Sequence, residues 1–150
     1  MWQLIVLAAL AAPGDKASAQ GKYPGIKAGA TKLAEAVVAL KAAEKTYAGH
    51  KRAALDALVE AQKELDQAVA YADRNDKPFE KGMHRFDTKA GLRAAASRKH
   101  PGLRDGAKRA IEAGKALDEG TTRFGGHRAN AIEKINAALK ELDKAARLAK

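Results

Sequence analysis

Apolar residues recur along this chain in steps of three and four, which is the spacing of one face of an α-helix. In the first half the stripe falls at Ile26, Ala30, Leu33, Val37, Leu40 and Tyr47, then at Leu55, Leu58, Leu65, Val69 and Ala72. In the second half it falls at Leu103, Ala107, Ala110, Leu117 and Phe124, then at Ile132, Ile135, Leu139, Leu142 and Ala146. No stretch alternates apolar and polar residues like a strand. The pattern therefore predicts four amphipathic helices, with Leu40, Leu65, Leu117 and Leu142 in the core.

The two halves are one unit written twice. Residues 23–73 align with residues 100–150 at an offset of 77, and 18 of the 51 aligned positions are identical without a gap. The segment 47–51 falls on 124–128, and the segment 63–66 falls on 140–143. The duplication predicts that both halves fold in the same way.

Proline and glycine mark where the predicted helices begin and end. Pro24 and Pro101 suit the first turn of a helix, where a missing N–H costs nothing. Gly49, Gly125 and Gly126 suit the left-handed residue that ends a helix, so each repeat is predicted to be a helical hairpin. The alternative is one long helix bent at each glycine. Two hairpins can bury each other's apolar faces, so we expect an all-α protein, an antiparallel four-helix bundle.

The N-terminus has the order of a secretory signal peptide. An apolar run from Leu4 to Ala12 is followed by the breaker Pro13-Gly14 and the small-residue triplet at 17–19. Nine apolar residues are too few for a membrane anchor, which needs about 20. We expect residues 1–19 to be removed, leaving one exported domain at 20–150, periplasmic or secreted, with no transmembrane segment. The absence of cysteine excludes disulfides and thiolate metal sites.

The positive charge is concentrated between the repeats. The net charge is +10, and residues 74–99 carry eight basic against three acidic side chains. The basic residues surround Phe79, Met83 and Phe86, a mixture that can dock on phosphates. Because the chain is predicted to be exported, an anionic component of the cell envelope is the expected partner rather than nucleic acid. The alternative is a solvated loop. The predicted anion-binding residues are Arg74, Lys77, Lys81, Arg85, Lys89, Arg93, Arg98 and Lys99.

A Gly-His pair occurs in both repeats, with an aromatic residue before it and a basic residue after it. Two imidazoles at the hairpin tips, His50 and His127, would form a weak transition-metal site if both tips lay at one end of the bundle. The 26-residue connection permits either orientation. The alternative is structural: each histidine satisfies backbone groups at its turn, and its ring packs on Tyr47 or Phe124. His100 is expected at the open end of its hairpin, away from His127.

Nothing in the sequence indicates catalysis. The chain has no nucleophile motif with an arranged base and no phosphate-binding glycine loop. We therefore predict a non-enzymatic protein without a small-molecule substrate or a cofactor, apart from weakly bound metal. The repeated carboxylates are predicted to be solvated or paired with Lys63 and Lys140; they are Glu64, Asp66, Glu141 and Asp143.

The repeat resembles that of the small periplasmic metal-binding proteins of bacteria. Each copy consists of an alanine-rich helix, a Gly-His turn and a second alanine-rich helix. The resemblance rests on Gly49-His50, Gly126-His127 and the spacing of the alanines, and it covers residues 23–73 and 100–150. It implies an exported four-helix bundle in which His50 and His127 bind metal. The many helical histidines of that family are replaced here by Ala, Lys, Asp or Glu. The first functional hypothesis is therefore a binding or structural protein of the cell envelope, with metal binding as the alternative.

Overall fold

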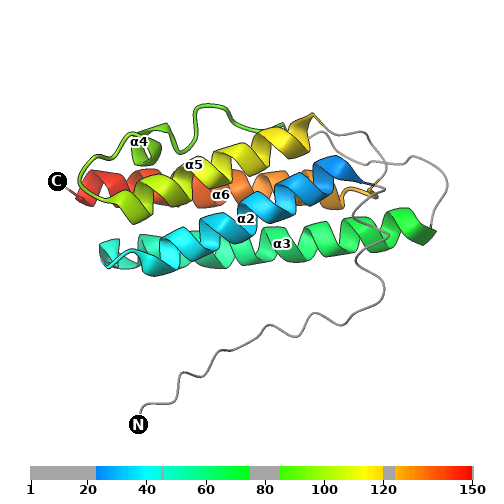
Figure 1. Cartoon of the computed structure of the whole chain (residues 1–150), viewed down its shortest axis with the longest axis horizontal. Helices are drawn as coiled ribbons and strands as arrows, with labels where there is room; N and C mark the ends of the chain where they lie inside the picture. Colours follow the sequence, from blue (N-terminus) through cyan, green and yellow to red (C-terminus); the bar gives the residue numbers. More distant parts are fainter. Residues whose placement is uncertain (1–22, 45, 75–84, 120–123, 150) are drawn as a thin grey trace, which may run out of the picture.

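In a computed structural model, residues 23–44, 46–74, 85–119 and 124–149 are described, and they form an all-α bundle. Its four long helices lie side by side (Figure 1): α2 (Pro24–Ala42), α3 (His50–Arg74), α5 (Pro101–Asp118) and α6 (His127–Leu148). Two short elements complete it, the 3₁₀ turn η1 (Tyr47–Gly49) and the one-turn helix α4 (Leu92–Ala95). The described residues contain no strand. The prediction of an antiparallel four-helix bundle built from two hairpins is confirmed.

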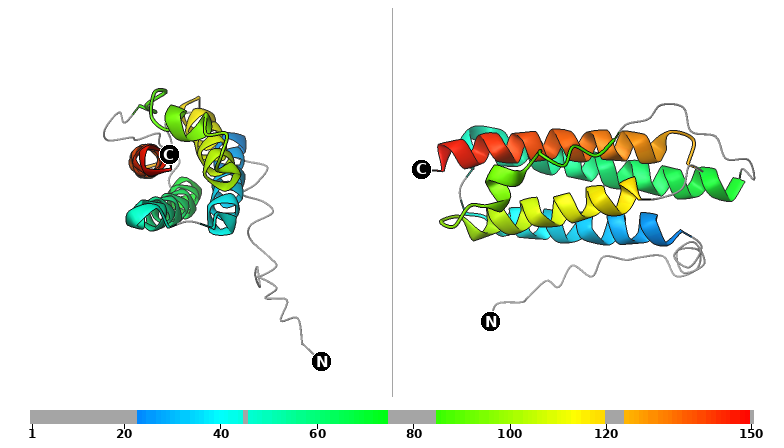
Figure 2. Two further views of the ribbon diagram at one scale, coloured as in Figure 1. Left: turned by 90° about the vertical axis from the view of Figure 1, so that its left-hand side faces the viewer. Right: turned by 90° about the horizontal axis from the view of Figure 1, so that it is seen from above.

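The two repeats pack on each other rather than each on itself. Helix α2 packs mainly against α5, and α3 mainly against α6, which are the helices that the duplication makes equivalent. Seen end-on, the four helices form a square with the equivalent helices as neighbours (Figure 2). Each pair is antiparallel, so the turn of the first hairpin and the turn of the second lie at opposite ends of the bundle (Figure 1). The repeats are thus related by a pseudo-twofold axis across the helices.

Both hairpins turn through left-handed backbone, as the glycines predict. In the second repeat Gly125 has φ 58° and Gly126 has φ 88°. In the first repeat Gly49 has φ 88°, but Tyr47 and Ala48 also have positive φ, at 51° and 52°. A side chain costs energy in this conformation, so the first turn is more strained than the second. The alternative of one long bent helix in each repeat is wrong.

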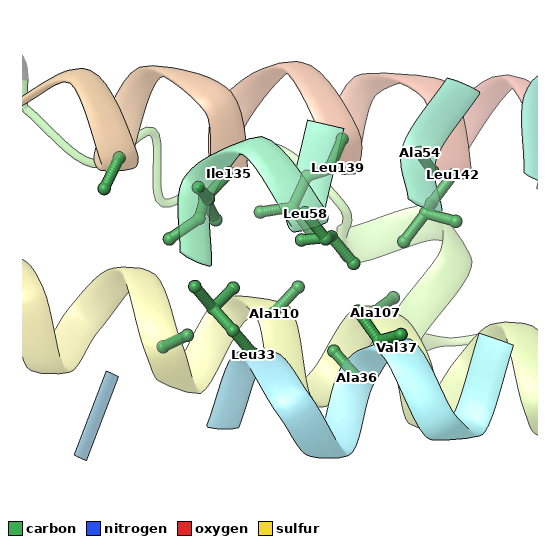
Figure 3. Packing of buried hydrophobic residues seen from close by; sticks show 14 of the residues in the cluster. Leu33, Ala36, Val37, Ala54, Leu58, Ala107, Ala110, Ile135, Leu139 and Leu142 are labelled. Atoms are coloured by element: carbon green, nitrogen blue, oxygen red, sulfur yellow. The ribbon is translucent and has the colours of Figure 1, made fainter. Parts of the chain in front are cut away.

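The core is made of alanine and leucine, and the predicted stripes supply it. Leu40, Leu65, Leu117 and Leu142 are each at most 1% exposed, which confirms their assignment. The close-up in Figure 3 shows side chains of all four helices meeting in one layer. Among the described residues no polar or charged side chain is buried. Apolar burial therefore holds the bundle together without help from a buried polar network.

Glycines let the equivalent helices approach closely. A Cβ built at Gly29 on α2 would lie 2.7 Å from Cδ2 of Leu117 on α5. The equivalent glycine, Gly106 on α5, meets the equivalent leucine, Leu40 on α2, with a Cβ distance of 2.5 Å to Cγ. Each leucine therefore fills the space that a side chain on the opposite glycine would need. The contact is made twice, with the repeats exchanged.

Aromatic contacts at the two ends of the bundle also join equivalent positions, with the roles of the two repeats reversed. The rings of Tyr47 and His100 meet edge to face with centroids 5.6 Å apart, and those of Tyr23 and Phe124 do so at 5.5 Å. Position 47 is equivalent to 124, and position 23 to 100. The rings of Tyr47 and Phe124 thus each contact a residue of the other repeat, and the ring of His127 contacts that of Tyr71, with centroids 6.3 Å apart.

The predicted signal peptide, residues 1–19, lies outside the described residues. Within the described ranges, no helix is both long enough and apolar enough to cross a membrane.

Candidate anion-binding surface and the paired histidines

The described part of the segment between the repeats lies over α5 and α6. These residues, 85–99, are here called the basic strap; they run alongside the two helices and include α4 (Figures 1 and 2). Phe86, Ala90 and Ala94 point inward and are at most 6% exposed. The ring of Phe86 fills a notch above Gly114, where an added Cβ would lie 2.2 Å from Cδ2 of the ring. The inner side of the strap is thus part of the core.

Backbone hydrogen bonds fix the first part of the strap to α6. The N–H of Asp87 donates to Oδ1 of Asn136 at 3.0 Å, and Nδ2 of Asn136 donates to the carbonyl oxygen of Arg85 at 3.1 Å. A single amide side chain therefore satisfies both a donor and an acceptor of the strap backbone.

Asp143 fixes the second part of the strap. Its Oδ2 accepts the N–H of Gly91 and its Oδ1 accepts the N–H of Ala94, each at 3.0 Å. Gly91 has φ 81° and leaves no room for a Cβ, which would lie 2.5 Å from Cδ2 of Leu139. The start of α4 is therefore held by one carboxylate and one close contact. The prediction that Asp143 is solvated or paired with Lys140 is wrong, since its oxygens serve the backbone of the strap.

The outer side of the strap carries positive charge. Its five basic side chains, against the single acid Asp87, are all exposed: Arg85, Lys89, Arg93, Arg98 and Lys99. Arg74, at the end of α3, is exposed as well. None of these six forms an ion pair with a carboxylate in the described part of the chain. Lys77 and Lys81, which were predicted to belong to the same surface, lie outside the described residues.

Some cations on the four helices are neutralised by carboxylates, so what sets the strap apart is its excess of five basic residues over one acid. On the pseudo-twofold axis, Lys32 and Glu35 of α2 meet the equivalent Arg109 and Glu112 of α5, with four nitrogen–oxygen distances of 3.0–3.4 Å. Burial acts to raise the pKa of Glu112, but hydrogen bonds from Arg109 and Lys32 outweigh it, so this pKa lies below the usual value. The positive charges of these residues are therefore neutralised within the fold.

The turn histidines bridge the two repeats. Nδ1 of His50 lies 2.7 Å from Oε2 of Glu141, and Nδ1 of His127 lies 2.8 Å from Oε2 of Glu64. Both pairs are partly buried, with side chains 23–30% exposed. The prediction that Glu64 and Glu141 are solvated or paired with Lys63 and Lys140 is wrong, because the antiparallel packing of α3 on α6 brings each of them to a histidine.

The two histidines do not come together. His50 reaches Glu141, which is 14 residues along α6 from His127. At 1.5 Å per residue this places the histidines about 20 Å apart, so a single intramolecular site using both is not formed. In the described part of the chain, no group of three or more His, Asp and Glu side chains is arranged to hold a metal ion. The predicted two-histidine metal site fails because the hairpin turns lie at opposite ends.

The residues after the histidines close the hairpins. Nζ of Lys51 donates to the carbonyl oxygen of Ala43, and a guanidinium nitrogen of Arg128 donates to that of Leu117 at 2.6 Å. Each basic side chain thereby satisfies a carbonyl at the end of the preceding helix. The repeated Gly-His-basic motif is explained by the architecture of the turn.

Comparison with known proteins adds no relative. The chain matches no protein-family model, and no curated protein or solved structure is significantly similar to it. The resemblance to small periplasmic metal-binding proteins therefore stays a prediction.

Proposed function

We propose that this chain is a non-enzymatic binding module of the cell envelope, which contacts an anionic partner through the outer side of the basic strap. The observation that carries the proposal is the concentration of exposed cations on the strap, where five basic residues stand against the single acid Asp87. Lys32, Arg109 and Lys134 have carboxylate partners, whereas the five cations of the strap have none among the described residues. Unpaired cations on a rigid backbone attract anions without first breaking an internal ion pair.

The strap is suited to this role because its inner side is anchored. Phe86 and Ala94 are buried, and Asn136 and Asp143 bind the backbone between them. The cations are therefore held along a line on the molecule's surface instead of on a freely moving loop. Less conformational entropy is lost when such a surface binds than when a flexible segment does.

The predicted signal peptide supports the choice of partner. An exported protein meets the anionic lipids and polymers of the envelope. The described residues bury no polar or charged side chain. A binding surface on the outside of the bundle is thus the arrangement that fits both the charge pattern and the apolar core.

Charge neutralisation tests the proposal. Residues 20–150 are titrated with vesicles containing phosphatidylglycerol and, separately, with polyphosphate, at low and high salt. The triple variant Arg85→Gln, Lys89→Gln, Arg93→Gln is compared with a control that removes the same charge from exposed positions on α2 and α3: Lys27→Gln, Lys41→Gln, Lys63→Gln. Each cation near an anionic surface contributes about 1 kcal/mol, so the strap variant should bind roughly 100-fold more weakly.

The control should lose much less affinity, because it changes the net charge but leaves the strap intact. Equal losses in the two triple variants would show that net charge alone drives binding, and the proposal would be wrong. Thermal unfolding of both variants checks that the bundle stays folded.

A further inference from the structure

Leu92 is an apolar side chain displayed among the cations of the strap. It is 54% exposed, although it opens α4, whose Ala94 is fully buried. The side chains of Lys89 and Arg93, close to it in the sequence, are exposed as well. In Figure 1, α4 stands on the outside of the bundle beside α5 and α6. At α4 the strap therefore combines one large exposed apolar group with positive charge.

We infer that the anionic partner of the strap is a lipid bilayer, and that Leu92 inserts into its interfacial region while the cations contact the headgroups. This inference rests on the proposed function and names its partner. Lysine and arginine bind phosphate on a polymer or on a lipid equally well. An exposed leucine gains free energy only where an apolar phase is available, and among anionic partners a bilayer provides one.

The backbone presents Leu92 in a fixed position. The carboxylate of Asp143 accepts the N–H groups of Gly91 and Ala94, on either side of Leu92. Gly91 packs against Leu139, so α4 cannot settle deeper into the bundle. Since little ordering is required on binding, the apolar gain from Leu92 is retained.

Val38, another exposed apolar side chain, lies in different surroundings. It is 68% exposed on α2, and the charged groups that line the hollow around it, with a volume of about 730 Å³, are of both signs: Glu35, Asp105, Lys108, Arg109 and Glu112. Charges of opposite sign cancel at a distance, so this surface lacks the positive excess that attracts an anionic lipid surface. Val38 is therefore a matched control for Leu92: similarly exposed and apolar, but placed among charges of both signs.

The chain's only tryptophan, Trp2, lies outside residues 20–150, so a new tryptophan reports on its own position. Leu92→Trp and Val38→Trp are prepared in residues 20–150 and mixed with phosphatidylglycerol vesicles and with polyphosphate. The emission of Leu92→Trp should shift to shorter wavelength with the vesicles and stay unchanged with polyphosphate. The emission of Val38→Trp should stay unchanged with both.

A second variant measures the contribution of the side chain. Leu92→Ser should weaken vesicle binding about three- to tenfold and leave polyphosphate binding unaltered, because about half of a leucine is newly buried. Vesicle binding without an emission shift at position 92, or without an effect of Leu92→Ser, would overturn the inference while the proposed function stands. If the unaltered protein binds neither probe, both the proposed function and this inference are wrong.

Discussion

Nδ1 of His50 lies 2.7 Å from Oε2 of Glu141, and 77 residues further along the chain the same contact is made with the repeats exchanged, between His127 and Glu64. Each histidine begins a helix of one repeat, and each glutamate lies on the equivalent helix of the other. The two pairs therefore fasten α3 to α6 at two places about 20 Å apart. This relationship makes the repeats mutually dependent.

The pairing predicts a specific energetic coupling. Replacing both His50 and Glu141 by alanine should reveal a coupling free energy of about 0.5–1.5 kcal/mol in a double-mutant cycle, because the pair is a partly buried, charge-assisted hydrogen bond. The free energy of unfolding is measured in urea for the two single variants and the double variant. The chain offers its own control, since His50→Ala combined with Glu64→Ala joins residues that are not in contact. That cycle should give a coupling near zero, and equal coupling in the two cycles would contradict the pairing.

Glu141 also predicts how stability depends on pH. Hydrogen bonds from Lys144, at 2.6 Å, and then from His50 hold the pKa of its carboxyl below the usual value. An unfolded glutamate titrates near about 4.3, so the stabilisation is complete above that pH and is lost as the pH falls through the lower pKa of the folded state. Glu141→Gln should therefore be less stable than the unaltered protein at neutral pH, and the difference should shrink towards about pH 3.

The measurement is urea unfolding at both pH values. Glu119→Gln, which removes an exposed carboxyl at the end of α5, is the control and should show no such narrowing. If the free energy of unfolding of Glu141→Gln differed from that of the unaltered protein by the same amount at both pH values, the ionised carboxylate would not be the stabilising group.

The glycine contacts predict an overpacking effect. Gly106→Ala should raise the helix propensity of α5 by about 1 kcal/mol, yet the new Cβ would lie 2.5 Å from Cγ of Leu40, and such overpacking costs about 1–3 kcal/mol. We expect a net loss of stability in urea unfolding. Leu40→Ala alone should cost about 2–5 kcal/mol, and on that background Gly106→Ala should become neutral or stabilising. Without this reversal, the close approach of α2 to α5 would not be limited by Leu40.

The helices, their turns and the alanine–leucine core could be predicted from the sequence, because apolar spacing and glycine act locally. Helix partners could not be predicted in the same way. A stripe of apolar residues shows which face is buried, but not whether α2 packs on α3 or on α5. The connection between the repeats was long enough for either orientation, so the separation of His50 from His127 appeared only in the fold.

A signal for the exchanged contacts was nevertheless present in the sequence. Both repeats kept the histidine and the glutamate at equivalent positions, and both kept the glycine and the leucine that meet as Gly29 with Leu117 and Gly106 with Leu40. When two such partners are conserved in both copies, a contact across the pseudo-twofold axis is as consistent with the alignment as a contact within one hairpin. The contacts of the strap could not be identified in this way, because the strap occurs once and has no second copy for comparison.

Substitution of Gly114 should loosen the contact between the strap and the bundle. The first repeat has Val37 at the equivalent position. Gly114→Ala places a Cβ 2.2 Å from Cδ2 of Phe86, so the ring should leave its notch and the strap should loosen. The amides of Gly91 and Ala94, which donate to Asp143, should then exchange their hydrogens faster, and the stability should fall by about 1–3 kcal/mol.

Hydrogen exchange detected by NMR follows these two amides directly. In the double variant Gly114→Ala, Phe86→Ala the added methyl no longer meets the ring, so the double variant should match the exchange of Phe86→Ala alone instead of adding to it. If the strap's geometry is what aligns the cations, Gly114→Ala should also weaken binding to phosphatidylglycerol vesicles although no charge has been removed. Unchanged exchange at Gly91 and Ala94 would mean that Phe86 does not hold the strap in place, and the rigid display of Leu92 and its neighbouring cations would need another cause.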